Sequence, residues 1–561
     1  MTGAEGLGSW GRIDNECGVI RVDTQDSVEW DDVADVLIAG YGGAGICAAL
    51  ELAEGGADVL AIDRFAGGGA TAFSGGVVYA GNTLYQKACG YEDSAAEMQA
   101  YLAMEVGDAV TTETLRRFCQ QSPENLRWLE AHGVEFGSTL YEGKITYPPE
   151  GFFLQFSGNE KVAEYARAAK PAPRGHRTKG RGFTGKYLYA ALRNAADAQS
   201  IRFRPHTVLD ALICDADGHV VGARINKLPA SAWKAHQKLY DEIKPTVPFK
   251  EVRAERNAKK ARALEADLGS FATVRAKKGI ILATGGYAFN LEMLGQFAPS
   301  LAEHYASLIR LGTLGDDGSA YRIGSSVNAK FSKAQSMFVG RVQSPPLALL
   351  DGILVNRSGH RFVNEAVYLG TLGRSIVDQP GGEAWLILPA SSLRKAVRQI
   401  FTGGMHAFKL FGAPALLNIF LGGTRRAANA FDLARKCGID PDGLAAQIAQ
   451  YDLAVAAGED TSYSKLSDHL LPLSNSRLVA LNVSLRNRFT FLQLMTLGGL
   501  AVDEADGTVL DDRGQRISGL YAAGRAAAGV PSNRYISGLS LADCVFSGRR
   551  AARACLDAPV A

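Results

Sequence analysis

The segment from 531 to 550 holds the two side chains with the clearest chemical potential. Tyr535 and Ser537 stand just before Gly538 and a helix-forming stretch with small residues in its first turn. A free tyrosine titrates near ~10, so it acts as a base only when a neighbour lowers its proton affinity. We therefore expect Tyr535 to accept a proton and Ser537 to relay it or to stabilise the phenolate. The alternatives are a packed tyrosine with a satisfied hydroxyl and a serine that caps the helix.

A glycine-rich turn near the start of the chain must position these residues. The apolar run 36–39 predicts a strand, Gly40-x-Gly42-x-x-Gly45 a tight turn, 46–54 a helix, and 57–62 a second strand that ends at Asp63. In such a βαβ unit the glycines allow the turn, the approach of a pyrophosphate and close helix packing, and the acidic residue binds a ribose. The turn therefore predicts a dinucleotide site.

Three further small-residue segments favour FAD over NAD. A second glycine-rich loop spans 67–76, a buried strand ends in Ala283-Thr284-Gly285, and a late strand ends at Gly524. A flavin needs backbone donors near its pyrophosphate and ring, which an NAD domain does not. The other GxGxxG stretches, at 6–11 and 180–185, follow no apolar run that predicts a strand, so we expect no built-in NAD(P)H domain, and electrons must leave to an external acceptor. The residues expected to bind FAD are Gly40, Gly42, Gly43, Ala44, Gly45, Asp63, Arg64, Ala70, Thr71, Ser74, Gly75, Gly76, Val208, Ala283, Thr284, Gly285, Gly524, Ser540 and Leu541.

The predicted elements define an α/β fold in which a Rossmann-like FAD-binding domain is interrupted by an α+β cap domain. We expect the FAD-binding domain at 1–300 and 490–561 and the cap at 301–489. A charged helical insertion at 228–272 is either a solvated surface helix or a docking site. The segment 403–423 is apolar but broken by glycine and proline. It is either a buried helix pair of the cap or an apolar lip on a membrane surface.

Composition narrows the classes of function. The chain has 561 residues, 47% of them hydrophobic and 21% charged, with a formal charge of +2. This near-neutral balance gives no reason to expect a nucleic-acid partner. The scattered cysteines and histidines have no metal-ligand spacing, so no metal is expected. No signal peptide or membrane-length apolar run is visible, so we expect a cytoplasmic protein, with membrane association possible only through 403–423.

Together these motifs resemble the flavoprotein family of fumarate reductases and 3-ketosteroid dehydrogenases. Gly359-His-Arg-Phe-Val-Asn-Glu365 matches the family's cap turn. The arginines that clamp a carboxylate in the reductases are replaced by Tyr535 and by Tyr368-Leu369, and the histidine that links covalently to FAD would fall near Gly69. The resemblance therefore implies non-covalent FAD and a substrate that is not a carboxylate.

Within the steroid branch, the stretch 535–544 looks like that of the 3-ketosteroid Δ4-(5α)-dehydrogenases. The resemblance implies desaturation at C4–C5, with Tyr535 and Ser537 as the proton-accepting pair. Tyr368 and the Gly538 N–H would donate to the ketone oxygen, Phe156 could line a steroid slot, and a quinone-like acceptor would take the electrons. Three alternatives stay open: Δ1-dehydrogenation, reduction of a small unsaturated acid such as fumarate or urocanate, and an RNA-modifying FAD protein that uses the basic stretch 253–262.

Overall fold

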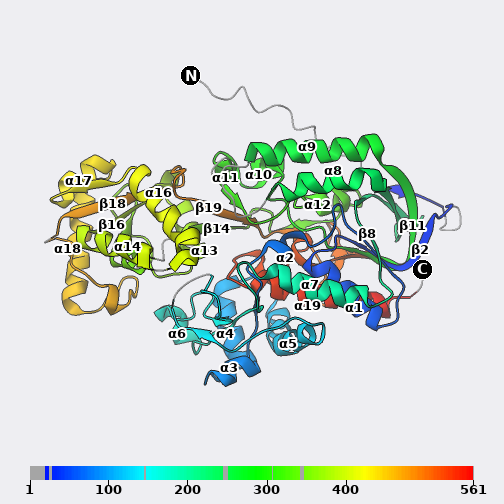
Figure 1. Ribbon diagram of the computed structural model, residues 1–561, viewed down its shortest axis with the longest axis horizontal. Helices are drawn as coiled ribbons and strands as arrows, with labels where there is room; N and C mark the ends of the chain where they lie inside the picture. Colours follow the sequence, from blue (N-terminus) through cyan, green and yellow to red (C-terminus); the bar gives the residue numbers. More distant parts are fainter. Residues whose placement is uncertain are drawn as a thin grey trace.

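Five parallel strands carry the predicted dinucleotide turn (Figure 1). The computed structural model describes residues 19–23, 28–143, 147–243, 251–305, 308–341, 346–402, 404–474 and 476–559. The parallel strands lie in the order β8 (Arg202–Arg204), β3 (Val59–Ile62), β2 (Asp32–Ala39), β11 (Ser270–Leu282) and β22 (Arg516–Ala522). The second half of β2, all of β3 and the last residues of β11 are fully buried, which is why they read as uninterrupted apolar runs.

The same sheet continues as an antiparallel ribbon. β10 (Val220–Lys227) pairs with the first half of β11 and, on its other side, with β9 (Thr207–Cys214). The turn between β9 and β10 contains Asp217 and Gly218, where the sequence predicted a hairpin. β1 (Ile20–Arg21) and β21 (Thr508–Leu510) complete the nine strands. The sheet therefore combines a Rossmann-like parallel half with an antiparallel extension.

Helices from both ends of the chain pack together beside the parallel strands. α1 (Gly43–Glu54) begins at the glycine-rich turn, and α19 (Leu539–Asp557) follows the Tyr535 segment. A Cβ on Gly548 of α19 would lie 2.5 Å from the Ala44 carbonyl oxygen, so only glycine allows this close approach. α7 (Gly185–Asp197) lies beside them (Figure 1).

The charged insertion forms two helices, α8 (Ala230–Asp241) and α9 (Glu251–Leu268), on the other side of the fold from α1 and α19 (Figure 1). The predicted charged helix is thus confirmed, although residues 244–250 of the insertion lie outside the described residues. α9 is not a solvated surface helix throughout. Its buried Ala254, Ala258 and Ala261 pack toward the rest of the fold.

The chain between β14 and β19 builds a separate antiparallel sheet. Its order is β15 (Ile353–Val355), β16 (Trp385–Pro389), β18 (Leu478–Asn482) and β17 (Arg425–Ala427). The surrounding helices are α13 (Leu369–Val377), α14 (Ala390–Thr402), α15 (Gly404–Ala407), α16 (Ala413–Leu421), α17 (Ala430–Cys437) and α18 (Pro441–Ala457), with a π-helical turn at Phe408–Gly412. In the predicted cap turn, the Arg361 guanidinium pairs with Glu365 and Asp460, each at 2.7 Å and buried. The motif therefore anchors the cap internally.

A three-stranded sheet joins the two parts: β12 (Leu308–Arg310), β19 (Leu492–Thr496) and β14 (Met337–Arg341). α12 (Ser319–Ser325) and the β13 (Phe331–Ser332)–β20 (Gly499–Leu500) pair pack on the core of the nine-stranded sheet. The domain boundaries at 301 and 489 stay predictions. Within the described residues no helix is long and apolar enough to cross a bilayer.

A third set of elements begins in the glycine-rich loop 67–76. It consists of the sheet β4 (Val77–Tyr79), β7 (Gly175–Arg177), β6 (Leu154–Gln155) and β5 (Leu140–Tyr141), and the helices α2 (Gly69–Phe73), α3 (Leu84–Ala88), α4 (Ala95–Val106), α5 (Thr112–Ala131) and α6 (Ala163–Ala168). Two further short helices, α10 (Leu291–Phe297) and α11 (Pro299–Ala302), follow β11.

Candidate active site

The glycine-rich turn has the geometry that a dinucleotide requires. Gly40 has a φ of +98°, and a Cβ there would overlap the Ala283 carbonyl. A Cβ on Gly45 would overlap the Gly40 carbonyl oxygen, whereas a Cβ on Gly42 would meet nothing closer than 3.8 Å. Gly40 and Gly45 are therefore fixed by the fold, and Gly42 leaves open space beside the backbone.

Asp63 closes this end of the site. Its carboxylate accepts hydrogen bonds from the backbone N–H groups of Tyr41 and Phe65, both at 2.8 Å. Burial raises the pKa of Asp63, and these backbone donors oppose the rise. The carboxylate lines two adjoining cavities, one of about 170 Å³ and one of about 520 Å³. Asp63 thus lies where a cofactor extending through both cavities would present its ribose.

The larger cavity is walled by the charged insertion. Arg64 donates two hydrogen bonds of 2.7 Å to Glu265 on α9 and pairs with Asp317 at 2.5 Å. His236 on α8 contacts Glu265 at 2.9 Å from the other side. Val208 also lines this cavity. The insertion therefore contributes directly to the adenosine end of the predicted FAD site.

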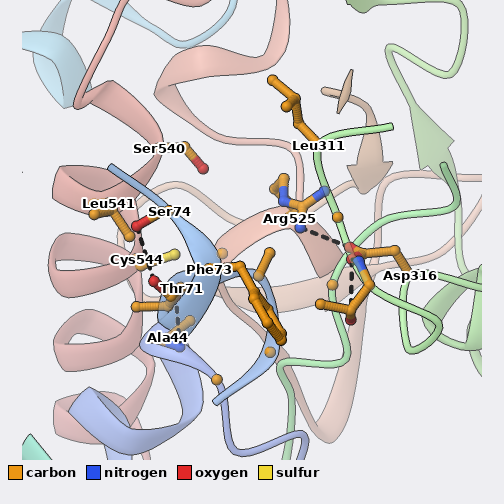
Figure 2. Close-up of a pocket in the computed structure, with 18 of the residues that line it drawn as sticks. Ala44, Thr71, Phe73, Ser74, Leu311, Asp316, Arg525, Ser540, Leu541 and Cys544 are labelled. Carbon is orange, nitrogen blue, oxygen red and sulfur yellow. Dashed lines mark hydrogen bonds and ion pairs between the residues drawn. The ribbon is translucent and has the colours of Figure 1, made fainter. Parts of the chain in front are cut away.

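Small residues, one ion pair and aromatic rings line the smaller cavity. Figure 2 shows Thr71 and Ser74 on one side and the Arg525–Asp316 pair on the other, with Phe73 between them. Arg525 Nη2 lies 2.6 Å from Asp316 Oδ1, so the arginine charge is balanced within the protein. Arg525 is the one basic side chain among the described residues that line this cavity.

Within the described part of the chain, two buried polar atoms of residues that line this cavity have no hydrogen-bond partner: Thr284 Oγ1 and Arg525 Nη1. A buried donor or acceptor without a partner is costly, so each is expected to meet a ligand. A flavin with its pyrophosphate carries acceptors for both, and Gly42 gives it room. The residues present therefore fit FAD.

Three tyrosines come together at the cap side of the cavity. Tyr535 and Tyr147 line it, and Tyr535 packs edge-on against Phe338 at 5.1 Å between ring centroids. Tyr368 also packs against Phe338, at 6.3 Å between ring centroids, and is buried. Burial raises the pKa of all three phenols. The Gly538 N–H donates to the Tyr535 hydroxyl at 3.4 Å and opposes this rise.

A buried polar chain holds Tyr368 in place. Asn159 Oδ1 accepts from the Tyr368 backbone N–H at 2.6 Å, and Asn159 Nδ2 donates to Glu105 at 2.7 Å. Tyr101 also donates to Glu105, at 2.6 Å. Burial raises the pKa of Glu105 to about 7 despite these donors. The cap residue Tyr368 is thus tied through Asn159 to α4 of the FAD-binding part.

The structure brings most of the predicted site residues together. Those that line the smaller cavity are Gly40, Gly42, Gly43, Ala44, Asp63, Ala70, Thr71, Ser74, Gly75, Gly76, Ala283, Thr284, Gly285, Gly524, Tyr535, Ser537, Gly538, Ser540 and Leu541. Arg64 and Val208 line the larger cavity, Gly45 packs inside α1, and Tyr368 lies next to the site without lining it. Phe156 lies apart, with its ring against Tyr91 and under the Lys161 ammonium.

Sequence reasoning missed several lining residues. Tyr147, Phe183 and Tyr240 supply aromatic walls, and Thr313, Asp316 and Arg525 supply polar contacts. Arg525 directly follows the glycine of the late strand, where an arginine beside small residues was a usable signal. Tyr147 stands in the Tyr-Pro-Pro stretch, but nothing local to that stretch places it opposite Tyr535.

Comparison with known proteins places this fold and site in one class. A family model described as "FAD binding domain" matches residues 35–541. The chain belongs to this family and is an FAD-dependent oxidoreductase of the fumarate reductase flavoprotein fold. The predicted fold class and cofactor are therefore confirmed.

Steroid-transforming enzymes are among its similar proteins. The 3-oxo-5-alpha-steroid 4-dehydrogenase of Comamonas testosteroni is 35% identical over 90% of this chain and 95% of its own length. The solved 3-ketosteroid Δ4-(5α)-dehydrogenase of Rhodococcus jostii RHA1, in complex with 4-androstene-3,17-dione, is 29% identical with a TM-score of 0.78, over 96% of this chain and 100% of that one. The 3-ketosteroid Δ1-dehydrogenase of Sterolibacterium denitrificans, 18% identical over 94% of this chain and 99% of that one with a TM-score of 0.61, shares the fold.

Proposed function

We propose that this chain desaturates a 3-ketosteroid at C4–C5 with non-covalently bound FAD. The observation that carries the proposal is the Tyr535 end of the cavity, where the rings of Tyr147 and Phe183 form apolar walls and that of Phe338 packs against Tyr535. Among the described residues that line the cavity, the one basic side chain, Arg525, is already paired with Asp316. A flat, neutral ketone suits such walls, whereas a dicarboxylate needs unpaired cations. The likeness to the Comamonas enzyme supports the same substrate class.

In the proposed desaturation, the proton and the hydride leave the steroid to different acceptors. Bound FAD supplies the acceptor for the hydride from C5. Tyr535 accepts the proton from C4, and the Gly538 N–H, which already contacts its hydroxyl, stabilises the phenolate. Loss of the proton and the hydride leaves the C4–C5 double bond. Ser537 is the expected relay for the proton taken up by Tyr535.

The ketone oxygen needs a hydrogen-bond donor because polarising it acidifies the C4–H bond. Tyr368 is the donor expected from sequence, and Asn159 fixes its backbone. Tyr147 lines the cavity directly and is the second candidate. The electrons leave to a quinone-like acceptor, since among the described residues only the stretch 40–45 joins a strand of the parallel sheet directly to an α-helix.

The test is anaerobic bleaching of the flavin by 5α-androstane-3,17-dione, with androst-4-ene-3,17-dione in parallel. We expect the saturated ketone to bleach the flavin and to yield the 4-ene, identified by NMR. Bleaching by the 4-ene alone would replace the proposal with Δ1-dehydrogenation. Bleaching by neither steroid, with reoxidation of dithionite-reduced flavin by fumarate or urocanate, would assign the chain to the reductases.

A further inference from the structure

An exposed apolar surface lies on the cap, away from both cavities. It consists of Phe401 at the end of α14, Met405 in α15, and Phe420 and Leu421 at the end of α16, which we call the lip. These side chains are 57–71% exposed. Figure 1 places α14 and α16 together in the cap, far from α1 and α19. Several large exposed apolar side chains on three helices that follow one another in the chain are unusual on a surface that only contacts water.

The chain segment that forms the lip carries charged side chains of one sign only. Between Glu383 and Asp432 the sequence contains no acidic residue, although the whole chain is almost neutral at +2. The same stretch carries six basic residues, and all are exposed: Arg394, Lys395, Arg398, Lys409, Arg425 and Arg426. None of them makes an ion pair within the part of the chain that the structure describes. The segment that forms the lip thus combines exposed apolar side chains with exposed bases that make no ion pair within the described residues.

A small cavity lies next to one of the lip helices. It has a volume of about 90 Å³ and is lined by residues of α16 and the π-helical turn before it, and by Ile309 and Gln493 among others. These two residues pair across β12 and β19. Two positions further along the same chain segments, Leu311 and Met495 line the smaller cavity. Because residues at i and i+2 share one side of a strand, both cavities lie against the same side of this sheet.

We propose that the lip binds the surface of an anionic membrane. Exposed aromatic and aliphatic side chains enter the boundary between headgroups and acyl chains, and the surrounding bases attract anionic lipids. An anionic lipid surface fits better than a protein partner because the segment from 384 to 431 offers apolar and basic side chains and contains no acidic residue. The inference is independent of the substrate's identity. It places the cavity beside α16 at the membrane, where an apolar substrate or acceptor would enter.

The test is co-sedimentation of the FAD-loaded protein with vesicles. One set contains phosphatidylcholine alone, and the other contains about one-third phosphatidylglycerol. We expect binding to the anionic vesicles only, and its loss at roughly 0.5 M NaCl, where the Debye length falls below ~5 Å. Equal binding to neutral vesicles, or no binding to either, would overturn the proposal.

Matched variants assign the binding to the lip. Arg425→Glu and Phe420→Asp should each weaken binding to anionic vesicles by roughly tenfold or more. The controls make the same changes elsewhere: Arg513→Glu in the turn between β21 and β22, and Leu453→Asp on α18, which is 73% exposed. Controls that weaken binding equally would refute the lip as the site. Loss of a dimer in Phe420→Asp, seen by light scattering without a change in vesicle binding, would instead identify the lip as an interface between copies.

Discussion

The pairing of Arg64 with Glu265 should decide how firmly the inserted helices hold the adenosine end of the cofactor site. Glu265→Gln keeps the shape of the side chain and removes its charge. Glu265 is 12% exposed and accepts two hydrogen bonds of 2.7 Å from Arg64. Hydrogen bonds to charged groups contribute roughly 1.5–3 kcal/mol each, so the loss should be about 3 kcal/mol.

The lowered pKa of Glu265 corresponds to a stabilising free energy of similar size. Burial raises its pKa, but Arg64 and His236 outweigh burial and lower it from 4.5 to about 2. A shift of roughly 2.5 units corresponds to about 3 kcal/mol. Because the pKa is lowered in the folded protein, this stabilisation is fully present above pH ~4.5 and is lost as pH falls toward 2.

Hydrogen–deuterium exchange of peptides from α9 measures this local stability. At neutral pH, Glu265→Gln should exchange on the order of 100-fold faster there than the parent protein. The difference should shrink below pH 4.5. The control is Glu113→Gln, which removes a solvent-exposed pair with Arg116 on α5 and should change exchange less than about threefold. Equal effects of the two variants, or a difference at α9 that does not change with pH, would refute the reasoning.

Three further outcomes follow from the site. Tyr535→Phe should lower the rate of flavin reduction by roughly 10²–10⁴-fold while FAD stays bound. Because burial raises the pKa of this phenol, kcat/KM of the parent protein should rise above neutral pH, and the variant should lack this rise. An unchanged pH profile would contradict the assignment of Tyr535 as the base. Gly45→Ala should yield protein that loses FAD on gel filtration because the Cβ would overlap the Gly40 carbonyl, whereas Gly295→Ala, with no atom within 4 Å, should retain it. Burial raises the pKa of the Asp543 carboxyl to about 6, so its ionisation destabilises the fold as pH rises. Asp543→Asn should therefore raise the thermal unfolding midpoint above pH 6 but not near pH 4. A lower midpoint at every pH would contradict this.

Local sequence patterns were sufficient for the elements of the nucleotide fold. The turn from Gly40 to Gly45 predicts a strand before it and a helix after it, and β2 and α1 lie there. The hairpin around Asp217 and the charged helix α9 were equally visible, since each depends on residues close in sequence. Buried parallel strands and a glycine turn leave few alternatives, which is why this part was predictable.

The missed site residues share a different physical cause. Tyr147, Asp316 and Arg525 come from three distant segments and meet only through the tertiary fold. No periodicity in one sequence reports such a meeting. Phe156 contacts Tyr91 and Lys161 and lines neither of the two cavities described above, so its place in a steroid slot stays a prediction.

The close packing of α1 against α19 has a consequence for biosynthesis. The wall of the flavin cavity combines Gly42 and Ala44, from the start of the chain, with Gly524 and Ser540, from near its end. At roughly 5–20 residues per second, a ribosome needs about half a minute or more to make the intervening residues. Throughout that time α19, which completes the wall of the flavin cavity beside the glycine-rich turn, has not yet been made. Cofactor capture is therefore a late step in the life of the nascent chain, and loss of α19 should give a product without flavin even though every glycine of the motif is present.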